Sequence, residues 1–154
     1  MQWDEFVDAA PELGAAGERL LVKDDGVAIG FLATVDRRVH LAPVCPIFCV
    51  PGVYLSVGAS TPKRRDLERD GRYVLHAFLA ANDEEFRIGG RARLIATEAD
   101  RARVQAAIRF GAFGRDDPIF ELDIVEAMWG YWENVGKPGT RPVRRTWRAR
   151  DATA

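Results

Sequence analysis

Apolar and polar residues alternate most regularly over residues 85–97, and this pattern predicts a β-strand with one buried and one solvated face. The apolar positions are Phe86, Ile88, Gly90, Ala92 and Leu94. The positions between them are Arg87, Gly89, Arg91 and Arg93. One face of this strand is therefore expected to pack on a core.

Six further segments are apolar, rich in β-branched and aromatic residues, or alternating in polarity. We expect strands at residues 26–35, 39–50, 53–57, 73–80, 120–124 and 144–148. The charged turn at 36–38 separates the first two, which predicts a β-hairpin, and Pro51-Gly52 predicts a second tight turn. Alternation alone does not show whether the sheet closes into a barrel.

Helical spacing of apolar residues predicts three short helices. The first covers residues 3–10 and ends at Pro11, the second follows Thr61, and the third covers residues 99–110. At 154 residues the chain fits one domain. We expect an N-terminal helical segment at 1–25 and a mostly-β (α+β), barrel-like unit at 26–148.

Charge and composition exclude several classes of partner. Lys and Arg total 22 against 23 Asp and Glu, a net charge of −1, so the chain has no overall positive field for nucleic acid or an acidic membrane. A nucleic-acid site on the strand face of Arg87, Arg91 and Arg93 would also lack aromatic residues for base stacking. No apolar run is long enough to cross a bilayer, and the first residues do not resemble a secretory signal, so we expect a cytoplasmic protein.

The metal-ligating residue types are few and scattered. Cys45 and Cys49 have no companion pair as in a zinc site, and in a strand they would lie too far apart for a disulfide, so we expect two small buried side chains. His40 and His76 are the side chains that titrate near neutral pH, and histidines in strands are more often structural than catalytic. No metal site and no catalytic residue is assigned.

The helix after Thr61 carries an unusual charge pattern. Thr61 is a good N-cap residue, Pro62 suits the first helical position, and Gly71 suits the position after the end. The first turn nevertheless contains Lys63-Arg64-Arg65, although free N–H groups already make that end electropositive. A bound phosphate would compensate for three such cations, with Ser60 and Thr61 as further donors.

Two observations weigh against a phosphate site. The three cations could instead form a solvated stripe neutralised by Asp66, Glu68 and Asp70 on the same helix. Pro62 also removes one backbone donor. Spacing alone does not decide between these interpretations.

Five segments in order resemble the pyridoxamine 5′-phosphate oxidase-like FMN-binding split-barrel family. They are GFLATVD at 30–36, VHLAPV at 39–44, YLSV at 54–57, STPKRRDL at 60–67 and DGRYVL at 70–75. The similarity covers residues 26–94, with weaker agreement over 120–147. It implies a six-stranded antiparallel split β-barrel whose homodimer forms two FMN sites at the subunit interface.

The resemblance also implies which residues bind the cofactor. The backbone of the second strand would lie along the isoalloxazine ring, and residues around the third strand and the helix would surround the ribityl chain and phosphate. A tryptophan, Trp129 or Trp132, and Arg145 would close the ring side from the other subunit. The implied residues are His40, Leu41, Ala42, Pro43, Val44, Ser56, Val57, Ser60, Thr61, Lys63, Arg64, Trp129 and Arg145.

One departure from the family pattern bears on the reaction. The oxidase carries Arg-x-His-x-Arg near its C-terminus, whereas this chain has a valine at the histidine position of Arg141-Pro-Val-Arg-Arg145. We therefore do not expect oxidation of pyridoxamine phosphate itself. The favoured hypothesis is a flavin-dependent oxidoreductase acting on a small organic substrate. The alternatives are a deazaflavin-dependent reductase and a non-catalytic flavin- or haem-binding module.

Overall fold

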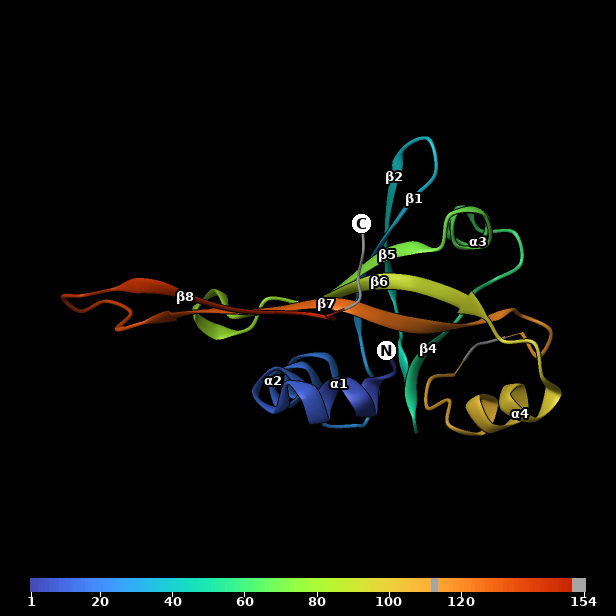
Figure 1. The fold of residues 1–154 in the computed structure, drawn as a ribbon, viewed down its shortest axis with the longest axis horizontal. Coiled ribbons are helices and arrows are strands. Elements are labelled where there is room, and N and C mark those ends of the chain that lie inside the picture. Colours follow the sequence, from blue (N-terminus) through green and yellow to red (C-terminus); the bar gives the residue numbers. More distant parts are fainter. Residues whose placement is uncertain (112–113, 151–154) are drawn as a thin grey trace.

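The computed structural model describes residues 1–111 and 114–150, without the side chain of Asn82. Figure 1 shows a strongly curved sheet with short helices around it. The helices are α1 (Trp3–Ala9), α2 (Pro11–Leu21), α3 (Pro62–Arg69) and α4 (Glu98–Ala106), with a 3-10 turn at Ala81–Asp83. The strands are β1 (Gly30–Val35), β2 (Val39–Val44), β3 (Ile47–Cys49), β4 (Gly52–Ser56), β5 (Arg72–Ala77), β6 (Glu85–Leu94), β7 (Ile119–Glu133) and β8 (Arg141–Arg148).

The sheet is antiparallel and follows the order β2-β1-β5-β6-β7-β4-β3, with β8 paired to β7. The predicted mostly-β split barrel is confirmed, with a path of seven strands and β8 beside it where six strands were expected. β7 can pair with both β4 and β8 because it has 15 residues. Its first part pairs with β4, and its second part continues as a long arm that pairs with β8.

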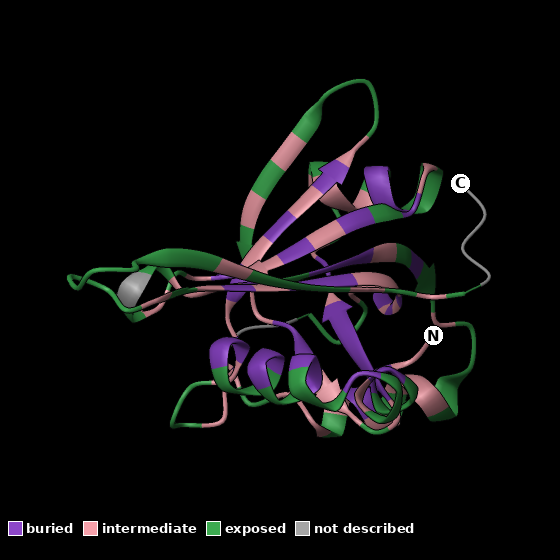
Figure 2. Cartoon of the chain, turned by 60° about the vertical axis from the view of Figure 1, so that its left-hand side comes forward, coloured by how far each residue is buried: buried purple, intermediate pink, exposed green. Residues whose placement is uncertain are grey.

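One face of the sheet holds the core, and the helices cover that face. Figure 2 shows buried residues alternating along the central strands and lining the inner sides of the N-terminal helices. Phe6 of α1 packs against Trp147 of β8, with ring centroids 5.1 Å apart. Leu75, Phe86 and Ile88 on β5 and β6 are fully buried. The buried and exposed faces that the sequence predicted for β6 are thus confirmed, although Leu94 at its end is exposed.

Three local predictions are corrected by the structure. The segment at 39–50 is two strands instead of one, because the chain leaves β2 at Cys45-Pro46 and β3 pairs with β4. Pro11 ends α1, but it also begins a second helix, where a proline is tolerated at the first position. Cys45 and Cys49 are free thiols and half-buried, not fully buried as expected.

A β-bulge brings two strands unusually close. The register between β6 and β7 shifts at Gly89/Gly90. A Cβ atom added at Gly90 would lie 1.9 Å from the carbonyl oxygen of Asp123. Position 90 therefore has no room for any side chain, and only glycine fits there.

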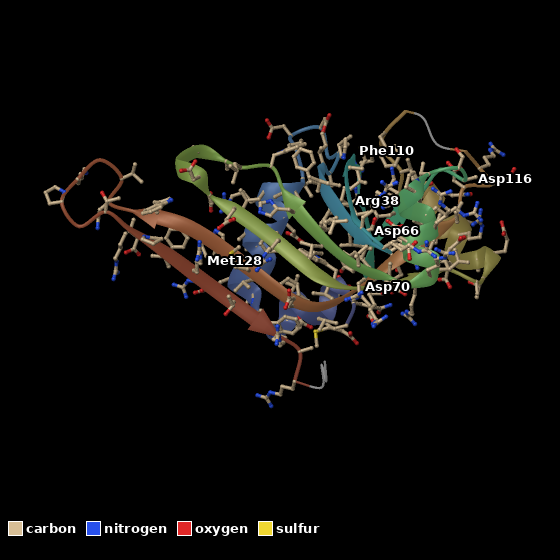
Figure 3. All side chains as sticks on the ribbon, turned by 90° about the horizontal axis from the view of Figure 1, so that it is seen from above. Arg38, Asp66, Asp70, Phe110, Asp116 and Met128 are labelled. Atoms are coloured by element: carbon tan, nitrogen blue, oxygen red, sulfur yellow. The ribbon has the colours of Figure 1, made fainter. Side chains whose placement is uncertain are left out.

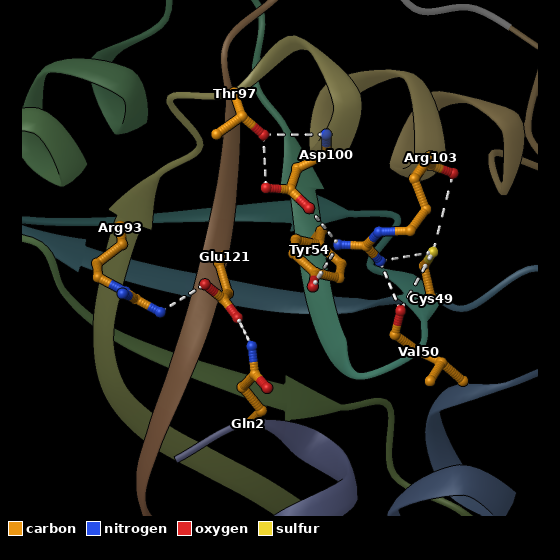
Figure 4. A network of polar contacts seen from close by, with 9 residues as sticks. All are labelled: Gln2, Cys49, Val50, Tyr54, Arg93, Thr97, Asp100, Arg103 and Glu121. Carbon is orange, nitrogen blue, oxygen red and sulfur yellow. Dashed lines mark hydrogen bonds and ion pairs between the residues drawn. The ribbon is translucent and has the colours of Figure 1, made fainter.

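Arg103 of α4 joins the helix to the β3–β4 hairpin (Figure 4). Its guanidinium donates to the carbonyl of Val50 at 2.5 Å and to Cys49 Sγ and Tyr54 Oη at 3.2 Å each. It also pairs with Asp100 at 3.2 Å. These contacts hold α4 over a small second core at this end of the sheet. None of the described helices combines the length and apolar content needed to cross a membrane.

Candidate functional site

The N-terminus of α3 lacks the side-chain cap that its sequence predicted. Thr61 stands at the N-cap position, but its hydroxyl donates to the carbonyl of Gly58 at 2.9 Å and makes no bond to the helix. The first turn contains no acidic residue. The end of α3 agrees with prediction, since Gly71 adopts a φ of 77° just after the C-cap. The first N–H groups of α3 therefore have no side-chain oxygen from their own cap residue.

The three cations of the first turn differ in their contacts. Arg64 donates to Glu68 at 2.8 Å and to the carbonyl of Ala59 at 3.1 Å, so its charge is already used within the helix. Lys63 and Arg65 form no ion pair or hydrogen bond within the described part of the chain. The solvated-stripe interpretation thus accounts for Arg64. Its two neighbours are not paired with the acidic residues of the helix: Arg65 is exposed and Lys63 is half-buried.

The other predicted phosphate residues surround the same helix end. Ser56 is the last residue of β4, and Ser60 is exposed. The Val57 side chain is fully buried, so only its backbone could contact a ligand. A Cβ atom added at Gly58 would meet nothing closer than Thr61 Cγ2 at 3.5 Å. The protein itself therefore does not require glycine at position 58, although a group bound close to that backbone would.

The predicted ring-binding strand, β2, lies at the edge of the sheet and pairs with β1. Its backbone groups on the other side are not bonded to any described strand. Val39 and Leu41 are 70% and 68% exposed on the face away from the helices. His40 and Ala42 point to the opposite face, where β2 lies beside Thr34 and Leu32 of β1.

The structure adds a site residue that sequence reasoning treated as a surface charge. Asp66 is 2% exposed, and its Oδ2 atom lies 2.6 Å from Thr34 Oγ1 and 2.7 Å from His40 Nδ1. The available signal was its position beside Leu67, which is also buried and marks the inner face of α3. Asp66 is therefore not part of a solvated stripe.

Trp129 and Arg145 lie on the long arm of the sheet, away from α3. In Figure 3, Asp66 marks α3 and Met128, next to Trp129 in β7, marks the arm, and the two lie apart. The Trp129 indole donates to Glu84 at 2.8 Å, and Arg145 pairs with Glu12 of α2 at 2.8 Å. One protomer therefore does not bring these two residues together with α3 and β2.

Glu84, the partner of Trp129, is part of a charged contact with α2. Arg19 donates to its carboxylate at 2.9 and 2.5 Å, and this bond, with help from Trp129, lowers the pKa of Glu84. Both contacts hold the Trp129 side chain on the helix-covered face. Trp132 alternates to the other face of β7 and is 42% exposed. It is the most exposed of the described tryptophans.

The outer face of the sheet is hollowed. A shallow groove of about 980 Å³ runs over β1, β5 and β6, with Ala33, Val35 and Val74 in its apolar lining. A smaller hollow of about 310 Å³ continues from it toward β8 and shares Val74 and Glu126. Hollow and groove together lie opposite the helix-covered face. The described residues contain no group of His, Cys, Asp and Glu that could hold a metal ion.

Proteins similar to this chain are found by comparing structures, not by comparing sequences. No family model and no curated protein sequence matches the chain. A protein assigned as a pyridoxamine 5′-phosphate oxidase from Listeria innocua superposes with a TM-score of 0.59 at 15% identity, covering 76% of this chain and 94% of its own. This chain has the pyridoxamine 5′-phosphate oxidase-like split-barrel fold.

Other split-barrel structures are similar to the chain. The FAD binding protein from Mycobacterium smegmatis has a TM-score of 0.56 at 18% identity, covering 91% of this chain and 96% of its own. A heme binding protein from the same organism has a TM-score of 0.57 at 19% identity. It covers 86% of this chain, which spans 57% of that longer protein. The fold is thus shared with both flavin-binding and haem-binding proteins.

Proposed function

We propose that this protein binds FMN through its 5′-phosphate at the N-terminus of α3 and acts as a flavin-dependent oxidoreductase on a small organic substrate. The observation that carries the proposal is the first turn of α3. Lys63 and Arg65 have no partner among the described residues there, the cap hydroxyl of Thr61 turns away, and Gly58 leaves the backbone open. Cations and free N–H groups at a helix N-terminus suit a phosphate dianion.

The residues present fit such a cofactor. Lys63 would bind the phosphate, and Ser60 would donate a hydroxyl hydrogen bond. Thr61 would donate its own once its hydroxyl leaves the carbonyl of Gly58, and Arg64 would assist from its bond to Glu68. The open edge of β2, from His40 to Val44, would support the isoalloxazine ring through backbone groups, with Ser56 and Val57 beside the ribityl chain. Bound FMN supplies hydride or electron transfer. The protein would orient it and exclude water.

We propose that the functional form is a homodimer in the cytoplasm. The groove on the outer face and the exposed Val39 and Leu41 form an apolar surface next to β2. A second copy on this surface could bring its arm to the ring side of the site, which one protomer leaves open. Because Glu84 and Glu12 hold Trp129 and Arg145 on the helix-covered face, Trp132 is the residue of the arm that we favour for contact with the partner.

The first test is the absorbance spectrum of the purified protein, followed by FMN titration. A flavin spectrum supports the proposal. A Soret band would instead favour haem, which the similarity to a heme binding protein makes the main alternative. A deazaflavin spectrum would favour the reductase alternative, for which the arginines of β8 would suit an anionic coenzyme tail.

The phosphate assignment is tested by Lys63→Ala, with Lys23→Ala at a distant loop as the matched control. Loss of a charge-assisted contact should weaken FMN binding by roughly 1.5–3 kcal/mol, which is about ten- to hundredfold in Kd. Riboflavin, which lacks the phosphate, should bind both variants equally well. If Lys63→Ala leaves the Kd of FMN unchanged, the phosphate is not bound there.

Turnover and assembly are tested separately. Anaerobic mixing of the FMN-loaded protein with a reduced nicotinamide should bleach the flavin if the protein is an enzyme, and a spectrum that never changes supports a binding module. Sedimentation should show a dimer. A monomer that holds one FMN per chain would contradict the shared interface.

A further inference from the structure

Two polar side chains are buried among the described residues, Thr34 and Asp66, and they are bonded to each other. The Thr34 hydroxyl donates to Asp66 Oδ2 at 2.6 Å. His40 Nδ1 lies 2.7 Å from the same oxygen. Both neighbours thus reach one oxygen of the Asp66 carboxyl group. The three side chains therefore form one connected polar group inside an apolar region.

A buried carboxylate is a costly choice for holding a short helix on a sheet. Taking a carboxyl group out of water is energetically unfavourable, and an apolar residue of similar size is often neutral or stabilising at such a site. Leu67, the next residue, already provides the apolar contact of α3. Polar groups are retained inside proteins at some sites because they specify one arrangement.

The group links three elements: Thr34 is on β1, His40 on β2 and Asp66 on α3. The helix packs mainly on β1, β5 and β6. The bond between His40 and Asp66 is the only hydrogen bond between β2 and α3 in the described part of the chain. Arg69 of α3 also pairs with Asp36, in the turn between β1 and β2, at 2.8 Å. Since β2 is an edge strand that pairs with β1 alone, the His40–Asp66 bond is its own direct link to the helix.

The same face of α3 leads to the cation-bearing end. Lys63 precedes Asp66 by three residues, so the two side chains lie one turn apart on one side of the helix. We propose that Asp66 is a positioning residue that, through His40, holds the ring-supporting strand β2 at a set distance and angle from the phosphate-binding end of α3. This inference rests on the proposed function, because it concerns the geometry of the same site.

The consequence is specific to a ligand that binds at two points. FMN touches both β2 and α3 in the proposed site, so it gains affinity when the two are held in the correct relative position beforehand. Riboflavin would use the ring side alone, and inorganic phosphate would use the helix end alone. Loosening the link between β2 and α3 should therefore weaken FMN binding and leave each fragment nearly unaffected.

The experiment compares Asp66→Asn and His40→Ala with wild type in titrations of FMN, riboflavin and inorganic phosphate. We expect the Kd of FMN to rise roughly tenfold, about the effect of losing one hydrogen bond to a charged group. In Asp66→Asn the other two Kd values should change less than twofold. His40→Asn, whose amide can donate from nearly the same place as Nδ1, should restore much of the FMN affinity.

Thr34→Val is the matched control, because it removes the other donor to Asp66 without cutting the link to β2. It should lower stability but keep the ratio of FMN to riboflavin affinity. If all three ligands weaken together in Asp66→Asn, the residue is structural and the inference is wrong. It is also wrong if FMN affinity does not change.

A measurement without flavin separates this inference from the proposed function. In the unliganded protein, amide hydrogen exchange in β2 should speed up at least about tenfold in Asp66→Asn while exchange in β6 stays as in wild type. Unchanged exchange in β2 would overturn the positioning role even if FMN binds. If exchange responds but wild type binds no FMN, the link between β2 and α3 stands as a structural finding, and both the proposed function and the role of Asp66 in FMN binding are overturned.

Discussion

Replacing Arg103 by leucine should destabilise the protein mainly through Tyr54. The Tyr54 side chain is buried, and its hydroxyl has Arg103 as its hydrogen-bond partner within the described residues. Burial raises the pKa of this phenol, so the hydroxyl stays neutral. In Arg103→Leu the hydroxyl loses this partner, and leucine offers no hydrogen-bonding group in its place. The protein therefore keeps a buried polar group without a hydrogen bond.

The magnitude follows from the separate contacts. An unpaired buried hydroxyl costs about 1–3 kcal/mol. The carbonyl of Val50 and the carboxylate of Asp100 are exposed enough to bind water, and the guanidinium is itself about a third exposed, so their contribution is small. We expect a total loss of roughly 2–3 kcal/mol for Arg103→Leu. Tyr54→Phe alone should cost roughly 0.5–1.5 kcal/mol.

The double variant distinguishes this explanation from a general loss of packing. Once Arg103 is gone, Tyr54→Phe removes the unpaired hydroxyl and should regain about 1–3 kcal/mol, whereas it costs roughly 0.5–1.5 kcal/mol in wild type. The coupling is therefore about 2–4 kcal/mol, and each kcal/mol corresponds to about 2–4 °C in Tm for a domain of this size. Urea unfolding followed by circular dichroism measures all four proteins. Arg101→Leu on the same helix should show no coupling to Tyr54. Equal costs of Tyr54→Phe in both backgrounds would refute the reasoning.

Two further predictions concern the sheet and its arm. Gly90→Ala should lower the free energy of unfolding by roughly 3 kcal/mol or more, because its Cβ would lie 1.9 Å from a backbone oxygen. Gly89→Ala, whose Cβ would meet the flexible Glu126 side chain at 3.3 Å, should cost much less in the same urea titration, and similar costs would contradict the bulge geometry. Arg19 lowers the pKa of Glu84 from its ordinary 4.5, so this carboxylate stabilises the fold at neutral pH and stops doing so as the pH falls through the lowered value. The unfolding free energy of wild type should therefore fall more steeply below about pH 5 than that of Glu84→Gln, and parallel pH profiles would show that the contact with Arg19 contributes nothing.

Much of this protein could be predicted from local patterns in its sequence. The alternation along β6, the β1–β2 hairpin and the limits of α3 depend on neighbouring residues, on Pro62 and on Gly71, and all three are found in the structure. The concentration of cations in the first turn of α3 is also a property of sequence alone. Such features are readable because they arise within a few residues of each other.

Other features depend on residues that are distant in the chain. Sequence patterns did not show that β4 pairs with β7, that Trp129 turns toward Glu84, or that Asp66 is buried against His40. Each depends on which partner a strand edge or helix face meets after the sheet has curved, and no local periodicity records that choice. The sequence thus determined the elements and the charged end of α3, and only the tertiary structure decided which of its side chains face the sheet and which remain available to a ligand.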